Sequence, residues 1–116
     1  VTMMGVSPAA AAEFVAERGA HIVALNCGTG MDMHGAAVVG RAYRENCMLP
    51  VMVQPNAGLP VLENLKAVYK QLPADMAKDV PDVLAAGVGI VGSCCGSTPD
   101  HTRAIRAVVE KFNQNK

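Results

Sequence analysis

Three short apolar segments alternate with helical patterns along the chain, and this alternation constrains the fold more than any other feature. The segments cover residues 21–25, 51–53 and 88–91 and are rich in β-branched and other apolar residues, as in strands buried on both faces. Because helices are predicted between them, each strand reaches the next by a crossover and pairs with it in parallel. The order of elements predicts an α/β protein.

Helix start and stop signals agree with this order. The predicted helices cover residues 8–19 after a capping Ser7, about 33–46, 73–86 with a kink at Pro81, and a last helix capped by Thr98. The segment 61–72 is open to two interpretations. Leu62, Leu65 and Val68 have helical spacing, whereas the flanking prolines favour an irregular course. Tyr69 in this segment is expected to pack at the surface, with a place in the wall of the pocket as the alternative.

The length of 116 residues suits one domain. Three strands are few for a sheet covered on both faces, and a closed eight-stranded barrel needs roughly 250 residues. Residues 1–116 are therefore predicted to be the C-terminal part of a (β/α)8 barrel, with a small three-layer domain as the alternative. A start at Val1 instead of Met is expected of a trimmed or excised piece.

Charge and hydropathy exclude several partners. Ten basic residues balance ten acidic ones, and no basic patch is present, so neither nucleic acid nor an anionic membrane is an expected partner. The longest apolar stretch, residues 83–92, is about half of what a membrane span requires. The first residues lack the basic region of a secretory signal, and a cytoplasmic, reducing location is predicted.

The cysteines carry the most specific chemistry. Cys27 follows the first predicted strand, and Cys94 and Cys95 follow the third. Because the ends of parallel strands gather at one edge of a sheet, these three thiols are expected to meet and form a three-thiolate metal site. Cys47 precedes the second strand, at the opposite end, and is predicted not to be a ligand.

The residues alone leave other uses of the thiols open. A disulfide between the neighbours Cys94 and Cys95 would be strained, and a buried pair of small apolar side chains is compatible with the pattern. A redox protein is the least favoured, since no C-x-x-C motif is present. The alternative function is a non-catalytic zinc-binding structural or interaction module, with Cys47 or a histidine as the fourth ligand.

Two asparagines are candidate substrate-binding residues. Asn26 and Asn56 each follow a predicted strand and are expected to face the same pocket, although Asn56 can also close its own turn. The histidines are expected to be structural or solvated, and none is needed to complete the metal site; they are His21, His34 and His101.

With these motifs the chain resembles the homocysteine S-methyltransferase family. Four segments carry the resemblance in the family's order and spacing: Met4–Pro8, Leu25–Gly28, Gln54–Pro60 and Ile90–His101. The resemblance implies a (β/α)8 barrel of which this chain forms the last three strands. It also implies a catalytic Zn²⁺ bound by Cys27, Cys94 and Cys95, with the substrate thiol as the fourth ligand.

The activity implied by the resemblance is methyl transfer to homocysteine, which yields methionine, without catalytic residues beyond the metal ligands. A corrinoid-linked donor is favoured because residues 55–60 look closer to the cobalamin-linked members of the family than to the members that use betaine. Cobalamin would then arrive on a partner domain or a corrinoid protein. The missing N-terminal half-barrel would bind the amino acid end of the substrate, so the piece alone is expected to be incomplete and to self-associate or pair with that half.

Overall fold

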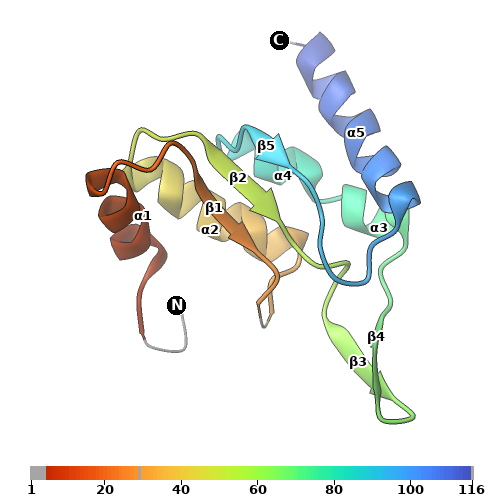
Figure 1. The fold of residues 1–116 in the computed structure, drawn as a ribbon. Coiled ribbons are helices and arrows are strands. Elements are labelled where there is room, and N and C mark those ends of the chain that lie inside the picture. Colours follow the sequence, from red (N-terminus) through yellow and green to blue (C-terminus); the bar gives the residue numbers. More distant parts are fainter. Residues whose placement is uncertain (1–4, 29, 116) are drawn as a thin grey trace.

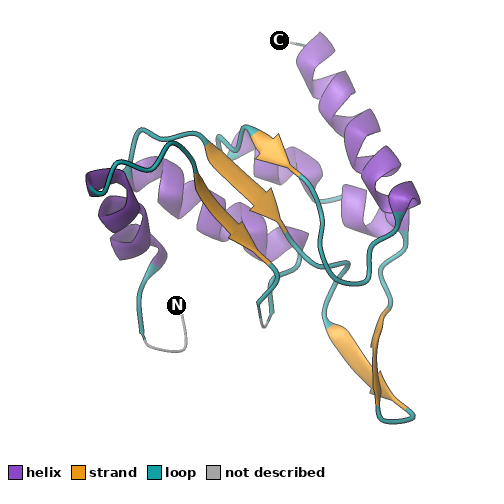
Figure 2. Cartoon of the chain, viewed as in Figure 1, coloured by secondary structure: helices purple, strands orange, loops and turns teal. Residues whose placement is uncertain are grey.

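A parallel sheet of three strands, in the order β1–β2–β5, lies at the centre of the structure (Figure 1). The structure is a computed structural model that describes residues 5–28 and 30–115. Its elements are α1 (Pro8–Glu17), β1 (Val23–Asn26), α2 (Met33–Asn46), β2 (Val51–Gln54), β3 (Pro60–Glu63), β4 (Lys66–Tyr69), α3 (Pro73–Ala77), α4 (Val80–Ala85), β5 (Ile90–Val91) and α5 (Pro99–Gln114). Figure 2 shows helices and strands alternating along most of the chain, and the predicted α/β class is confirmed.

The pairing of the three central strands is parallel, as predicted. Val23 of β1 lies opposite Val51 of β2, and Val53 of β2 lies opposite Val91 of β5. The third strand is shorter than expected, with two residues in place of the predicted 88–91. Backbone hydrogen bonds from Gly89 and Gly92 to β2 nevertheless continue the ladder on both sides of it.

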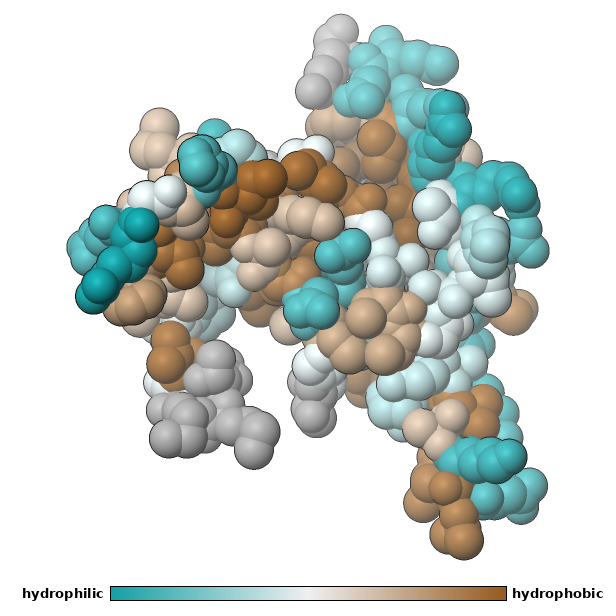
Figure 3. Space-filling model, viewed as in Figure 1, coloured by the Kyte–Doolittle hydropathy of each residue, from teal (hydrophilic) through white to brown (hydrophobic). Residues whose placement is uncertain are grey.

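Helices of the described residues cover only one face of this sheet. Val51 and Val53 are fully buried beneath α2, which approaches closely because Gly40 has no side chain: a Cβ there would lie 2.7 Å from Val88 Cγ2. Figure 1 shows the strands in front of α2 and α4, with no helix of the described residues over the face toward the viewer. Hydrophobic residues gather over the strands on that face (Figure 3). Ile90, which lies opposite Met52 in the ladder, is 40% exposed.

The helix boundaries follow local capping. The Ser7 hydroxyl accepts a hydrogen bond from the Ala10 amide at 3.2 Å, and the Asp32 carboxylate accepts one from the Gly35 amide at 2.8 Å. The predicted second helix has the bounds of α2, and Thr98 precedes α5 as predicted. No helix in the described ranges is long and apolar enough to cross a membrane.

The segment that was open to two interpretations is neither helical nor irregular. Strands β3 and β4 form an antiparallel hairpin closed by Asn64 and Leu65, whose φ angles are +49° and +64°. Two consecutive positive φ angles are typical of the tight turns that connect two strands in register. The hairpin projects away from the sheet (Figure 2), and its helical spacing of apolar residues is coincidental.

The prediction of a single kinked helix over residues 73–86 is wrong. The structure has two short helices, α3 and α4, and Pro81 lies in the first turn of the second. A proline there lacks only an amide that the first turn leaves unpaired, so a new helix start accommodates it better than a kink. The strands form an open sheet and a separate hairpin, and they do not by themselves show a barrel.

Candidate metal centre

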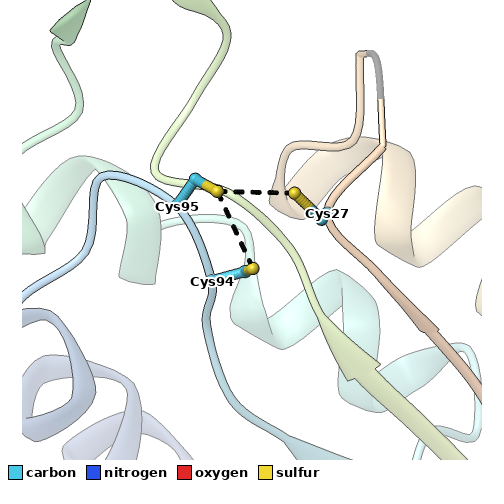
Figure 4. A group of neighbouring side chains, drawn as sticks. All are labelled: Cys27, Cys94 and Cys95. Carbon is cyan, nitrogen blue, oxygen red and sulfur yellow. Dashed lines mark hydrogen bonds between the residues drawn. The ribbon is translucent and has the colours of Figure 1, made fainter.

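Three cysteine side chains meet at the carboxyl ends of the parallel strands. Cys27 directly follows β1, and Cys94 and Cys95 lie in the loop between β5 and α5. Their sulfur atoms point toward one another (Figure 4), and all three lie within 4.8 Å of each other. The Cys95 sulfur is central, at 3.4 Å from that of Cys27 and 3.9 Å from that of Cys94.

The last residue of β2 and the loop after it support both cysteine loops through the backbone. The Cys27 amide donates to the Gln54 carbonyl at 3.2 Å on one side, and the Cys94 amide donates to the Pro55 carbonyl at 2.8 Å on the other. The Cys95 carbonyl accepts a hydrogen bond from the Ala57 amide at 2.9 Å. The middle strand of the sheet therefore sets the spacing between thiols that are 67 residues and more apart in the sequence.

Asn56 adds a side-chain connection between the same two loops. Its side-chain amide donates to the Gly28 carbonyl at 3.3 Å, and its side-chain oxygen accepts from the Cys95 amide at 3.2 Å. The residue is only 2% exposed, so these contacts are shielded from water. Leaving either partner unpaired in such a place costs more than a surface hydrogen bond does.

The backbone at Cys27 has an unusual conformation that directs its thiol. Its φ angle is +31°, in the left-handed region that side chains other than glycine rarely adopt. Such strain is concentrated at functional sites, where the surrounding structure maintains it. Here the hydrogen bond from the Cys27 amide to the Gln54 carbonyl holds the residue in place.

Hydrogen bonding between the thiols separates their acidities. Hydrogen bonds lower the pKa of Cys27 below the usual value of a cysteine. The largest contribution comes from the Cys95 thiol, and smaller ones come from the Gly28 backbone and from Cys94. The same bond to Cys27, then that to Cys94, raises the pKa of Cys95. In the metal-free cluster Cys27 is therefore the first of this pair to ionise, with Cys95 as the proton donor to it.

The cluster fits a thiolate-binding metal. Zn–S bonds of about 2.3 Å in tetrahedral geometry place two sulfur ligands about 3.8 Å apart. The two measured separations of 3.4 and 3.9 Å bracket that value. They are too long for a disulfide, whose S–S bond is about 2.05 Å, and the cysteines are free thiols.

A cavity of about 300 Å³ opens beside the cluster. Its lining residues come from the loops after β1 and β2 and from the base of the hairpin: Cys27, Gly28, Gly30, Asn56, Pro60 and Tyr69. None of these side chains carries a fixed charge. Of the two positions expected for Tyr69, the structure shows the less favoured one, the pocket wall, and the pairing of β3 with β4 brings the residue there.

The other candidate residues divide into those near the cavity and those away from it. Asn56 lines the cavity, whereas Asn26 is exposed at the end of β1 and is not part of the lining. Cys47 directly follows α2 and lies outside the thiol cluster. His21 and His34 are exposed.

His101 is the buried histidine, with 5% of its surface exposed. Its Nδ1 accepts a hydrogen bond from the Thr98 amide at 3.1 Å, which satisfies a free amide at the start of α5. Its Nε2 lies 2.7 Å from the Gln71 carbonyl, just after β4. His101 thus joins the hairpin to the helix that follows the cysteine loop, in agreement with the structural role expected for it.

Comparison with known proteins bears on the same residues. Residues 1–109 match the sequence profile of the homocysteine S-methyltransferase family. The methionine synthase of Mycobacterium leprae (strain TN) is 37% identical over 112 residues, which are 96% of this chain and 9% of that protein. The methionine synthase of Mycobacterium tuberculosis (strain ATCC 25618 / H37Rv) is 37% identical over 113 residues, 97% of this chain and 9% of that protein.

The chain thus spans about a tenth of the length of the curated relatives it matches. The family profile nevertheless covers nearly all of the chain, including the three clustered cysteines. Of the segments on which the resemblance rested, Met4 lies outside the described residues, as does Thr29 of the first cysteine loop. The chain belongs to the homocysteine S-methyltransferase family.

Proposed function

We propose that this chain provides the zinc-binding part of a site that transfers a methyl group to homocysteine and so forms methionine. The observation that carries the proposal is the cluster of Cys27, Cys94 and Cys95, whose sulfurs lie within 4.8 Å of one another. Membership of the family supports the methyltransferase activity. The names of the related methionine synthases support homocysteine as the acceptor.

The donor set suits a site that must keep a sulfur reactive. A bound Zn²⁺ would supply a Lewis acid with one position left for the substrate thiol, whose proton is lost at neutral pH. Three cysteine thiolates bring three negative charges against the two positive charges of the ion, so the site is rich in electrons. Zinc hydrolases, which activate water, instead use histidines and carboxylates.

In the overall reaction, the homocysteine thiol releases its proton and its sulfur forms a bond to the methyl carbon. The bond between that carbon and its carrier breaks, and the electron pair stays on the carrier. A corrinoid is the carrier we favour, delivered by a partner domain or protein. The described side chains contribute the three thiols and the cavity beside them.

The cavity defines which part of the substrate this chain can hold. Its volume of about 300 Å³ accommodates a thiol and a short carbon chain, and its lining has no fixed charge. Homocysteine also carries an ammonium and a carboxylate, which need charged or strongly polar partners. We assign the binding of that charged end chiefly to residues outside this chain. Of the two asparagines predicted to contact the substrate, Asn56 lines the cavity and is the candidate polar contact from this chain, whereas Asn26 lies away from the lining.

The uncovered face of the sheet is an argument that this chain is part of a larger barrel. Parallel sheets are normally covered on both faces, yet helices of the described residues cover only one face here (Figure 1). We propose that the chain is the C-terminal part of a (β/α)8 barrel, whose N-terminal half covers the exposed Ile90 and pairs with the free strand edges. The free thiols fit a cytoplasmic, reducing location.

Zinc content tests the proposal. The wild-type chain is compared with Cys27→Ser, Cys94→Ser and Cys95→Ser, and with Cys47→Ser as the matched control. We expect one zinc per chain in the wild type and in the control, and strong loss of zinc in the other variants. X-ray absorption should then count three sulfur ligands, and four after homocysteine is added.

Two results would contradict the proposal. Zinc that is retained in all three cluster variants would place the metal elsewhere. Zinc with four protein ligands and no response to homocysteine would favour the alternative, a structural zinc module. In that case, removal of the fourth protein ligand should unfold the chain.

A further inference from the structure

The cavity beside the thiol cluster is lined by two chemically different segments. The loop after β1 contributes Gly28 and Gly30, which have no side chains, and the base of the hairpin contributes Pro60 and Tyr69. No atom of the described residues lies within 4 Å of a Cβ added to Gly30, so the glycine segment leaves open space. The proline and tyrosine side chains present larger apolar groups, against which hydrocarbon can be buried.

Strand pairing places these two side chains next to each other. Pro60 and Tyr69 lie opposite one another as the pair at the end of the antiparallel ladder where the hairpin joins the rest of the fold. Figure 1 shows this end beside the loop that leads from β5 to α5. Tyr69 is half-buried there, whereas Leu62 and Leu65 farther along the hairpin are 71% and 92% exposed. The base of the hairpin is thus the part that belongs to the site.

Tyr69 rests on the backbone of the cysteine loop. A Cβ added to Gly96 would overlap the Cβ and Cγ atoms of Tyr69 and would lie 2.9 Å from its Cδ2. Gly96 directly follows Cys95, so the near part of the tyrosine ring is fixed relative to the loop that carries the central thiol. Only a residue without a side chain allows this approach.

The chain that follows Tyr69 is anchored on further elements. The Gln71 amide donates to the Ala57 carbonyl at 3.4 Å, and the Gln71 carbonyl lies 2.7 Å from His101 Nε2. The Gln71 side chain packs on Gly58, where an added Cβ would lie 2.7 Å from its Cγ. The hairpin base is therefore held in place before a ligand arrives, and a preformed surface loses little conformational entropy on binding.

We propose that Pro60 and Tyr69 form an apolar wall that binds the carbon chain of the acceptor thiol. The inference rests on the proposed function and names the class of acceptor, a thiol whose sulfur is followed by an unbranched hydrocarbon segment. Because the cavity lining has no fixed charge, methylenes gain by leaving water there, whereas a charged group would lose its hydration. Tyr69 contributes the larger surface and is the residue that sets the dependence on chain length.

The test measures how thiol affinity depends on chain length. Co²⁺ replaces zinc, and a thiol that binds as a further ligand changes the sulfur-to-cobalt charge-transfer band, so titration gives a Kd for ethanethiol, propanethiol and butanethiol. In the wild type we expect the Kd to fall about two- to fourfold for each methylene added. In Tyr69→Ala the Kd should be nearly the same for all of these thiols.

Two matched variants serve as controls. Tyr69→Phe keeps the ring and should retain the dependence on chain length, which distinguishes the apolar surface from any effect of the hydroxyl. Leu62→Ala removes apolar atoms from an exposed position of the same hairpin, outside the cavity lining, and should also retain it. Unspecific adsorption of thiols on exposed apolar surface would instead be reduced by this substitution. Far-UV circular dichroism confirms that each variant is folded.

A second measurement does not require that Tyr69→Ala folds. The chain has two tyrosines, so in Tyr43→Phe the ring protons of Tyr69 are the remaining tyrosine signals in the NMR spectrum. With zinc bound, we expect nuclear Overhauser effects between these ring protons and the carbon-bound protons of butanethiol. The absence of such effects at saturating thiol would show that the chain of the ligand does not contact Tyr69.

The outcomes separate this inference from the proposed function. A wild-type chain that binds Co²⁺ and thiols, but with the same Kd at each chain length, overturns the apolar wall and leaves the metal site intact. A Tyr69→Ala variant that keeps the full dependence on chain length does the same. A wild-type chain without any thiolate band, or with a band that no thiol changes, overturns the metal site and the wall that depends on it.

Discussion

Substitution of Gly96 by alanine probes the packing of the hairpin on the cysteine loop. The φ angle of Gly96 is +79°, and a left-handed conformation costs an alanine about 1–2 kcal/mol. The new Cβ would also lie 2.2 Å from Tyr69 Cβ, and overpacking of this kind costs about 1–3 kcal/mol more. The expected loss in the free energy of unfolding is therefore about 2–5 kcal/mol.

Two other glycines separate these contributions. Gly19 has a φ angle of +86° and no atom within 4 Å of the added Cβ, so Gly19→Ala should cost only about 1–2 kcal/mol. Gly89 has open space around it and no positive φ angle, and Gly89→Ala should change stability by less than about 1 kcal/mol. Urea unfolding followed by far-UV circular dichroism measures all three variants.

A double-mutant cycle identifies the steric partner. Tyr69→Gly removes the atoms that the new Cβ meets, so Gly96→Ala should cost about 1–3 kcal/mol less in that background than in the wild type. A Gly96→Ala variant no less stable than Gly19→Ala, with no coupling to Tyr69, would refute the packing on which the position of Tyr69 depends.

Further predictions concern the thiol cluster and its supports. Asn56→Ala should lose about 1–3 kcal/mol for each buried partner left unpaired, whereas Asn26→Ala, at an exposed position, should lose almost nothing in urea unfolding. In the metal-free chain, limiting iodoacetamide should modify Cys27 before Cys95, because hydrogen bonds lower the pKa of Cys27 and raise that of Cys95. Mass spectrometry of the peptides gives the order of modification. The reverse order would contradict the assignment. Burial raises the pKa of Tyr43 in the folded chain. The neutral Tyr43 phenol therefore contributes fully to the free energy of unfolding below the unfolded pKa of about 10, and this contribution is lost as pH rises through the folded pKa. The unfolding free energy of Tyr43→Phe should therefore fall less than that of the wild type above pH ~10.

The sequence predicts most clearly those parts of the fold that depend on interactions between residues close together in the chain. Ser7 and Asp32 cap their helices through bonds to amides three residues on, which is a contact within one turn. The parallel pairing follows from apolar strands separated by helices, and it brings strand ends to one edge. The meeting of Cys27 with Cys94 and Cys95 was predictable for this reason, although the distances between them were not.

The hairpin was not predictable because it lacks the burial that produces a strand pattern. All four residues of β3 are exposed, so no alternation between a buried and an exposed face is imposed on the sequence. Leu65 stands at a turn position with a φ angle of +64°, where glycine would have been a clear signal. The sequence left Tyr69 open between the surface and the pocket wall, since its contact with Gly96 joins residues that are far apart in the chain.

Asn56 shows a different limit of sequence reasoning. An asparagine after a strand predicts either a turn or a polar contact, and both roles use the same side-chain atoms. In the structure the side chain spans two loops that only the fold brings together, with one atom bonded to Gly28 and the other to Cys95. These two bonds engage both ends of the amide, which makes Asn56 a stronger support for the thiols than Asn26.

The proposal that different residues bind the two ends of homocysteine has a consequence for the affinity of this chain for thiols. The sulfur end of homocysteine would depend on the thiol cluster, whereas its charged end would depend on residues outside this chain, because the cavity lining carries no fixed charge. Metal affinity and substrate affinity are then separable properties. The chain alone should bind zinc through Cys27, Cys94 and Cys95 and bind simple alkyl thiols about as well as homocysteine. A clear preference for homocysteine over an uncharged thiol of the same length would show that this chain also recognises the amino acid end.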